Sequence, residues 1–188
     1  MLLQGHVALI TGSGRNIGAS IAQSFAREGA DIVVNVRSSV AEGEETVRAV
    51  RALGRKATLI VADVTDSRQV RAMAEQAARE LGVIDILVNS AGINIRGPIH
   101  QLSLEQFREV QRTNVEGTWL SCRAVIPHMI SRGYGRICNI ASALGVVGLA
   151  NRTPYTSSKG AVVQMTRALG LELAQTGVVC NAICPGPF

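Results

Sequence analysis

The sequence predicts an α/β fold in which a doubly wound parallel sheet lies between two layers of helices (α/β/α). Short apolar segments alternate with longer segments of helical period along the whole chain, and strands joined by helices pair in parallel through right-handed crossovers. Several apolar segments are rich in Val and Ile, which is typical of strands covered on both faces. With 188 residues and 47% hydrophobic content, the chain is long enough for one domain with a single core.

Six apolar segments are expected to form the strands. They cover residues 6–11, 31–36, 57–63, 84–92, 135–142 and 178–186. The helical segments between them cover residues 16–28, 39–53, 67–81, 103–132 and 155–175. Ligands of such sheets bind beyond the carboxyl ends of the strands. The residues directly after each strand are therefore the candidates for a site, and these segments are rich in Gly, Asn, Ser and Asp.

Charge and composition argue against nucleic acids, membranes and metals as partners. The net charge of +5 comes from 19 Lys and Arg against 14 Asp and Glu, with no basic run and only 3% aromatic residues. No apolar run could span a bilayer and no secretory signal opens the chain, so we expect a cytoplasmic protein. The cysteines form no CxxC pair and have no histidine at ligand spacing, so structural thiols in a reducing compartment are expected. They are Cys122, Cys138, Cys180 and Cys184.

A glycine-rich turn, TGSGRNIG at residues 11–18, joins the first strand to the first helix. Such a turn lets the backbone approach a pyrophosphate, whose charge then meets the N-terminus of the helix. By itself the turn fits an ordinary tight turn equally well. Gly12 and Gly18 would allow the backbone to approach the pyrophosphate closely. Residue 16 is an asparagine, the non-glycine residue that best tolerates left-handed backbone angles.

The spacing Thr-Gly-x-x-x-Gly-x-Gly in this turn resembles the fingerprint of the short-chain dehydrogenase/reductase family, with Asn16 in place of the middle glycine. The segment 89–92, Asn-Ser-Ala-Gly, resembles the family's Asn-Asn-Ala-Gly. The resemblance implies a Rossmann fold that binds a nicotinamide dinucleotide. The expected cofactor contacts are Gly12, Ser13, Arg15, Asn16, Ile17, Gly18, Arg37, Ser38, Asp63, Val64, Asn89, Ala91, Gly92, Tyr155, Lys159, Pro185 and Gly186.

The end of the second strand favours NADP(H) over NAD(H) as the cofactor. An NAD site commonly has Asp or Glu there to hold the ribose hydroxyls, but this chain has Val36, followed by Arg37 and Ser38. No carboxylate at this position repels a 2′-phosphate, and Arg37 is able to bind one, with Arg15 as a second contact. The alternative is that both arginines are solvated surface residues.

A tyrosine and a lysine four residues apart form the candidate catalytic pair. Residues at this spacing share one face of a helix, so Tyr155 and Lys159 can point into the same cleft. A free phenol has a pKa of ~10, and a neighbouring ammonium favours the phenolate, as proton exchange with an alcohol or ketone requires. The spacing alone is common on helix surfaces, so the pair needs support from the rest of the chain.

That support comes from the family resemblance. Ser142, Tyr155 and Lys159 match its Ser…Tyr-x-x-x-Lys arrangement, and Asn114 matches a fourth catalytic residue. The resemblance implies that Tyr155 exchanges the proton with the substrate oxygen, while Ser142 orients that oxygen. Lys159 would bind the nicotinamide ribose and act on the tyrosine, and Asn114, near a helix irregularity, would hold a water that links Lys159 to solvent. These motifs occur in family order over residues 6–187.

The pattern is most similar to carrier-protein β-ketoacyl reductases, and the sugar and polyol dehydrogenases of the family are the alternative. The expected substrate is thus a small carbonyl or alcohol compound, either free or bound to a carrier protein. A catalytically silent, cofactor-binding protein is a further alternative. The helices at 103–132 and 155–175 correspond to those through which relatives assemble, so a homodimer or homotetramer is expected.

The resemblance also predicts how the chain is organised as a domain. Residues 1–188 are expected to form a single dinucleotide-binding and catalytic domain. Relatives continue beyond the Pro185–Gly186 turn with a helical lid over the substrate and a last strand, and this sequence lacks both. The sequence therefore predicts a domain that is truncated at its C-terminus.

Overall fold

The structure, a computed structural model, describes residues 1–186; residues 187 and 188, the last of the loop predicted after the sixth strand, lie outside the described part. The strands are β1 (Val7–Thr11), β2 (Asp31–Val36), β3 (Ala57–Val61), β4 (Ile86–Asn89), β5 (Gly135–Ile140) and β6 (Val178–Ile183). The helices are α1 (Asn16–Arg27), α2 (Val40–Ala52), α3 (Ser67–Leu81), α4 (Leu104–Gln111), α5 (Gly117–Arg132) and α6 (Thr153–Glu172).

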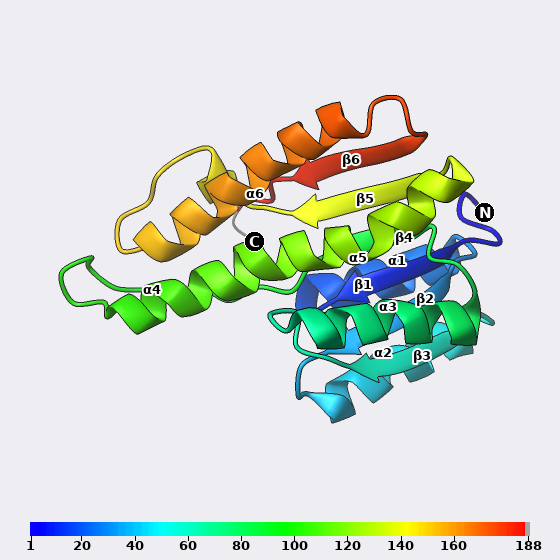
Figure 1. Ribbon diagram of the computed structural model, residues 1–188. Helices are drawn as coiled ribbons and strands as arrows, with labels where there is room; N and C mark the ends of the chain where they lie inside the picture. Colours follow the sequence, from blue (N-terminus) through cyan, green and yellow to red (C-terminus); the bar gives the residue numbers. More distant parts are fainter. Residues whose placement is uncertain (187–188) are drawn as a thin grey trace.

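The six strands form one sheet in the order β3-β2-β1-β4-β5-β6, and all neighbours pair in parallel. The chain runs outward from β1 to β3, returns to the centre and continues from β4 to β6, so the strand order reverses between β1 and β4. Helices α1 and α2 cover one face, while α3, α5 and α6 cover the other (Figure 1). The predicted doubly wound fold is confirmed.

The central strands are apolar throughout because each of their faces packs against helices. Leu9 of β1 belongs to a buried cluster with Met73 of α3 and Met129 of α5. The next residue, Ile10, points to the opposite face and packs with Ala22 of α1 and Val47 of α2. Successive side chains of a strand alternate between faces, so an uninterrupted apolar strand supplies both halves of the core.

Strand β6 departs from this pattern because only one of its faces is covered. Val179 is 45% exposed and Ile183 is 53% exposed, whereas Val178 and Cys180 are buried. Helix α6 packs against β6, while α1 and α2 pack against β1, β2 and β3 at the other end of the sheet. The expectation of strands covered on both faces therefore holds for the centre of the sheet and fails at β6.

The segment predicted as a single helix over 103–132 is divided into three parts. Helix α4 begins with a capping box, in which the Ser103 hydroxyl accepts a hydrogen bond from the Gln106 N–H and the Gln106 side chain accepts one from the Ser103 N–H. A π-helical turn, Arg112–Glu116, separates α4 from α5. Such turns widen a helix locally and occur frequently at functional sites.

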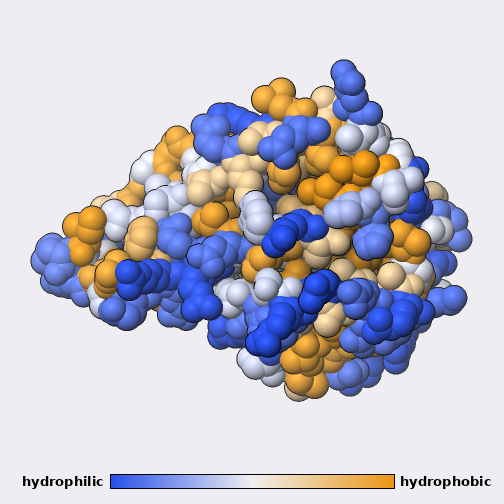
Figure 2. Space-filling model, in the orientation of Figure 1, coloured by the Kyte–Doolittle hydropathy of each residue, from blue (hydrophilic) through white to orange (hydrophobic). Residues whose placement is uncertain are grey.

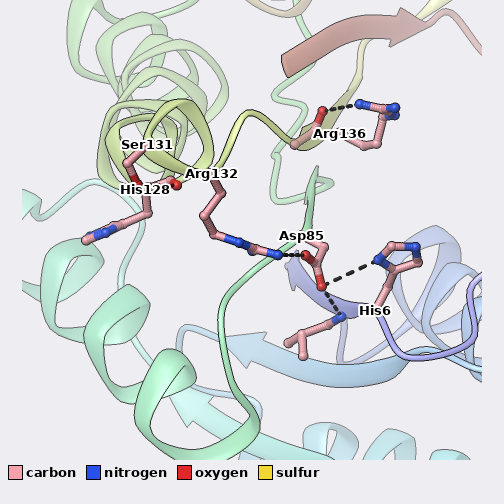
Figure 3. Close-up of polar contacts among 8 residues, drawn as sticks. His6, Asp85, His128, Ser131, Arg132 and Arg136 are labelled. Atoms are coloured by element: carbon pink, nitrogen blue, oxygen red, sulfur yellow. Dashed lines mark hydrogen bonds and ion pairs between the residues drawn. The ribbon is translucent and has the colours of Figure 1, made fainter. Parts of the chain in front are cut away.

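A buried aspartate ties three elements together at the amino ends of the strands (Figure 3). Asp85 precedes β4, is 5% exposed, and accepts hydrogen bonds from the Val7 N–H (2.9 Å) and from the Arg132 guanidinium at the end of α5 (2.9 Å). The imidazole Nδ1 of His6 lies 3.5 Å from the same carboxylate, and this ring stacks on Tyr134. The cluster lies at the edge of the sheet opposite to the carboxyl ends of the strands.

We expect Asp85→Ala to lower the free energy of unfolding by about 2–4 kcal/mol, because it removes a buried carboxylate that accepts hydrogen bonds from the Val7 N–H and from Arg132. The cofactor affinity should be unchanged, since the cluster lies at the far edge of the sheet. Urea unfolding followed by circular dichroism measures the first quantity, and a dinucleotide titration measures the second. A loss below about 1 kcal/mol would show that the cluster behaves like an exposed ion pair.

Two of the cysteines act as small apolar groups in the core. Burial raises the pKa of Cys122 to about 12 and that of Cys180 to about 11. Both thiols lie in the cluster beneath α3 and α5, where a protonated thiol packs like a small hydrophobic side chain.

Within residues 1–186, no helix is both long and apolar enough to cross a membrane.

Candidate active site

A cleft of about 580 Å³ lies at the carboxyl ends of the strands, where the strand order reverses between β1 and β4. The residues predicted from the sequence line it, with the exception of Ser13, Asn89 and Asn114, which lie behind its wall. The predicted residues in the lining are Gly12, Arg15, Asn16, Ile17, Gly18, Arg37, Ser38, Asp63, Val64, Ala91, Gly92, Ser142, Tyr155, Lys159, Pro185 and Gly186.

The glycine turn has the close contacts that its sequence predicts. Gly12 has a positive φ of 64°, and a Cβ atom there would lie 2.7 Å from the Cα of Ala91. A Cβ atom on Gly18 would collide with the carbonyl oxygen of Gly12. Asn16 adopts the left-handed conformation, with φ of 51°, as expected for a residue in place of a glycine. The turn is compact because side chains are absent where backbones meet.

The N-terminus of α1 opens into the cleft. Among residues 1–186, no side chain caps its first turn, and this turn carries no acidic residue. Asn16, Ile17 and Gly18 of the turn line the cleft. A helix N-terminus has free N–H groups and the positive end of the helix dipole, which together attract anions. This end of the cleft therefore fits the pyrophosphate of a dinucleotide.

Ser13 contributes to the site by holding the turn rather than by lining the cleft. It is fully buried; its hydroxyl donates to the Ile10 carbonyl (2.7 Å) and accepts from the Asn35 N–H (3.1 Å). Asn35, in β2, uses its amide group to donate to the carbonyls of Ile60 and Ala62 in and after β3. The sequence motif does not single out Asn35, because its role depends on pairing between β2 and β3.

The segment after β4 is fixed by two side chains. The Thr11 hydroxyl oxygen accepts from the N–H groups of Ser90 (3.1 Å) and Ala91 (3.2 Å), which anchors the turn to the end of β1. The buried Asn89 donates from its amide to the side-chain oxygen of Asn139 in β5 (2.8 Å). Asn89 therefore holds the strands together beneath the cleft. Its side chain is not part of the cleft lining, where the sequence predicts a cofactor contact.

Charged side chains surround the cleft where β2 ends. Arg37 and Ser38 follow Val36 directly and line the cleft, as predicted. Arg15 comes from the glycine turn, and its Nη1 atom lies 3.5 Å from Oε1 of Glu42 in the first turn of α2. Glu42 also lines the cleft. The sequence pattern gives no signal for Glu42, because only folding brings α2 against the glycine turn.

Tyr155 and Lys159 both project into the cleft from the first turns of α6. Lys159 is only 6% exposed; its Nζ atom donates to the Ile140 carbonyl at the end of β5 (2.6 Å) and lies 5.7 Å from the centroid of the Tyr155 ring. Burial lowers the pKa of Lys159 to about 8, because leaving water disfavours the charged ammonium. The lysine is thus held in place next to the tyrosine.

Asn114 lies within the π-helical turn and reaches across to two other segments. Its side-chain oxygen accepts from the Ile93 N–H (2.8 Å), and its amide donates to the Ile93 carbonyl (3.0 Å) and to the Ser158 hydroxyl (2.9 Å). A Cβ atom on Gly92 would meet both the Asn114 oxygen (3.2 Å) and Lys159 Nζ (3.6 Å). Asn114 and Lys159 therefore both lie close to Gly92.

Ser142 follows β5 and caps a 3₁₀ turn, Ala143–Gly145. Its hydroxyl oxygen accepts from the Leu144 N–H at 3.1 Å and lines the cleft with Tyr155. Gly145 allows this turn to rest on α6, since a Cβ atom there would lie 2.8 Å from the carbonyl oxygen of Lys159. The three catalytic candidates Ser142, Tyr155 and Lys159 thus share one wall of the cleft, with Asn114 behind them.

This arrangement supplies a hydroxyl donor, a phenol and an ammonium at one end of a cleft whose other end fits a pyrophosphate. Proton exchange with a substrate oxygen requires such groups on a rigid frame. Here the frame consists of α6, the π-helical turn and the ends of β4 and β5. The geometry suits acid–base chemistry on an alcohol or a carbonyl compound.

Comparisons with known proteins show which family the chain resembles. The family model described as short chain dehydrogenase matches residues 6–188. The 2-(R)-hydroxypropyl-CoM dehydrogenase of Xanthobacter autotrophicus is 41% identical over 96% of this chain and 74% of that protein. The ketoacyl reductase HetN of Nostoc sp. is 39% identical over 98% of this chain and 64% of that protein.

A solved structure of a gluconate 5-dehydrogenase from Burkholderia cenocepacia, in complex with NADP and tartrate, superposes with a TM-score of 0.92 at 38% identity. The superposition covers 98% of this chain and 72% of that protein. Similarity of this extent in sequence and in structure, together with the cleft described above, establishes the family. The chain belongs to the short-chain dehydrogenases, a family of oxidoreductases.

Proposed function

We propose that the protein is an NADP(H)-dependent oxidoreductase that interconverts a ketone and a secondary alcohol. The observation that carries this proposal is that one continuous cleft is lined both by the glycine turn with the N-terminus of α1 and by Ser142, Tyr155 and Lys159. A bound nicotinamide supplies or accepts the hydride in such a reaction. The protein's part is then to orient the substrate oxygen and to move a proton to or from it.

In this proposal the Tyr155 hydroxyl exchanges the proton with the substrate oxygen, and the Ser142 hydroxyl holds that oxygen by a hydrogen bond. Lys159 is confined by its bond to the Ile140 carbonyl (2.6 Å), so its ammonium stays beside the phenol. Asn114, which lies close to Gly92 as Lys159 does, holds the water that connects the lysine to solvent. Each role follows from a group that lies in the lining or directly behind it.

The preference for NADP(H) is supported by the charges beside β2. Val36 places no carboxylate at the end of the strand, and Arg37 follows it in the cleft lining. A guanidinium group binds a phosphate through paired hydrogen bonds. The gluconate 5-dehydrogenase of similar structure was solved with NADP, which is consistent with the same cofactor here.

The proposed substrate is a β-ketoacyl group on a carrier protein or a related thioester, with a sugar or polyol as the second candidate. Relatives include a ketoacyl reductase and a gluconate 5-dehydrogenase, so both candidates have support. A catalytically silent, cofactor-binding role is less favoured, since all of the candidate catalytic side chains are present. We place this reaction in the cytoplasm.

A homodimer or homotetramer formed through the long helices is part of the proposal. Helices α4 to α6 carry large apolar side chains at the surface: Phe107 is 39% exposed, Trp119 is 49% exposed and Leu171 is 81% exposed. Figure 2 shows apolar and hydrophilic side chains interspersed over α4 and α5. Exposed apolar side chains of this size are common in protein–protein interfaces.

The proposed function predicts NADPH oxidation that depends on a ketone. Initial rates should be measured with a β-ketoacyl thioester, a keto sugar acid and a simple cyclic ketone, each with NADPH and with NADH. We expect the highest rate with the thioester and NADPH. Faster reduction of the keto sugar acid would favour the polyol alternative. Cofactor binding without turnover of any compound would favour the silent, cofactor-binding role.

A further inference from the structure

The cleft beside β2 contains a carboxylate whose position indicates a role in choosing the cofactor. Glu42 lines the cleft together with Arg37 and Ser38. Its Oε1 atom faces Arg15, while its Oε2 atom is buried and has no hydrogen-bond partner among residues 1–186. A buried carboxylate oxygen without a donor is unfavourable. A hydrogen bond donated by a bound ligand would remove this cost.

The position of Glu42 is fixed by contacts between the glycine turn and α2. A Cβ atom on Gly14 would crowd Cγ1 of Val36 at 2.8 Å, whereas its distance of 3.5 Å from Cβ of Glu42 is an ordinary packing contact. The Thr46 hydroxyl lies 3.2 Å from the Gly14 carbonyl oxygen and 3.3 Å from the Glu42 carbonyl oxygen, and can donate to either. The first turn of α2 is thus held against the glycine turn, with its carboxylate at the cleft.

The charges at this end of the cleft partly cancel. Arg15 and Arg37 contribute two positive charges, and Glu42 contributes one negative charge. The Arg15–Glu42 pair is largely solvent-exposed, with side-chain exposures of 69% and 40%. Pairs of this kind are weak, so a ligand can replace either partner. A ribose with free hydroxyls would gain an acceptor here, whereas a phosphate would meet a like charge.

We propose that Glu42 determines specificity at the adenosine ribose: its free carboxylate oxygen accepts hydrogen bonds from the ribose hydroxyls of NAD(H), and its charge opposes the 2′-phosphate of NADP(H). Glu42 therefore limits the preference for NADP(H) that Arg15 and Arg37 create. It does from α2 what an acidic residue at the end of β2 commonly does in NAD sites. This inference rests on the proposed function, because it requires a dinucleotide whose adenosine ribose lies beside β2.

The test is a fluorescence titration of the Glu42→Gln variant with NADPH and, separately, with NADH. Glutamine keeps the size of the side chain and removes its charge. We expect the Kd for NADPH to fall and the Kd for NADH to rise, so that their ratio shifts about tenfold toward NADPH. The shift in the NADPH value should shrink at high salt, because it is electrostatic.

Glu45→Gln is the matched control, because Glu45 lies on the same helix, is exposed and is not part of the cleft lining. It makes the same change in net charge and should leave the ratio unaltered. An unchanged ratio in Glu42→Gln would overturn the inference. Weaker NADPH binding with unchanged NADH binding would also overturn it, since Glu42 would then serve to hold Arg15 for the phosphate.

The same titrations separate this inference from the proposed function. If the parent chain binds NADH more tightly than NADPH, the proposed cofactor preference is wrong, while the shift caused by Glu42→Gln still decides the role of Glu42. If the parent prefers NADPH and the variant shows no shift, only the role of Glu42 is wrong. Binding of neither cofactor by the parent would overturn both.

Discussion

Tyr155→Phe is expected to lower the rate of ketone reduction by about 10³-fold, because it removes the hydroxyl that exchanges the proton with the substrate oxygen in the proposed mechanism. The aromatic ring remains, so the 5.7 Å approach of Lys159 Nζ to the ring and the packing at the start of α6 are retained. The Kd for NADPH should therefore change little. Stopped-flow or steady-state rates at saturating NADPH measure the effect directly.

The chain offers a matched control for this experiment, because its second tyrosine lies far from the cleft. Tyr134 stacks on His6 with a distance of 5.4 Å between ring centroids, at the amino ends of the strands. Tyr134→Phe removes the same hydroxyl and should leave the rate at the parent level. A Tyr155→Phe variant that reduces ketones as fast as the parent would exclude Tyr155 as the proton donor.

The sequence predicts most of the fold because its signals are local. The apolar segments locate all six strands, and the helical period over 67–81 predicts a helix that coincides with α3. The left-handed conformation of Asn16 also follows from residue type and spacing. In each case the chemistry of a short segment limits the backbone to one arrangement, so no knowledge of distant contacts is needed.

Other features depend on contacts between distant segments, and the sequence pattern does not reveal them. The helical period over 103–132 continues through the π-helical turn, and only the family resemblance expects a helix irregularity near Asn114. The turn is accompanied by the contacts of Asn114 with Ile93 and Ser158. Glu42 reaches the cleft because α2 packs against the glycine turn, where the Thr46 hydroxyl lies 3.2 Å from the Gly14 carbonyl oxygen. Ser13 matches the motif but faces the strands behind it. The motif indicates candidate residues for a site, and contacts between distant segments decide which side chains face the cleft.

Lys159→Met is expected to abolish most of the activity and at the same time to stabilise the protein at neutral pH. Lys159 is nearly fully buried, and burial lowers its pKa from 10.5 to about 8. A shift of this size corresponds to about 3 kcal/mol of destabilisation when the lysine is charged in both states. Loss of the hydrogen bond to the Ile140 carbonyl offsets about 1 kcal/mol of the gain. We therefore expect a net stabilisation of about 1–2 kcal/mol at pH 7.

The pH dependence distinguishes this effect from a simple gain in packing. Below pH 8 the lysine is charged in the folded and unfolded states, so the parent carries the full cost of burying the charge. Between pH 8 and 10.5 the unfolded state binds more protons than the folded state, so the parent becomes more stable as the pH rises. The advantage of Lys159→Met should therefore fall by about 2 kcal/mol between pH 7 and pH 9.5, which is about 1.4 kcal/mol per pH unit above pH 8.

Urea unfolding at a series of pH values measures this dependence, and Lys56→Met is the control, because Lys56 is the chain's other lysine and is exposed. The control should show a small and pH-independent change. A Lys159→Met variant with a constant advantage from pH 7 to pH 9.5 would show that Lys159 titrates normally in the folded protein. The expected result instead means that the protein gives up stability at neutral pH to keep an ammonium beside Tyr155, where the proposed proton transfer requires it.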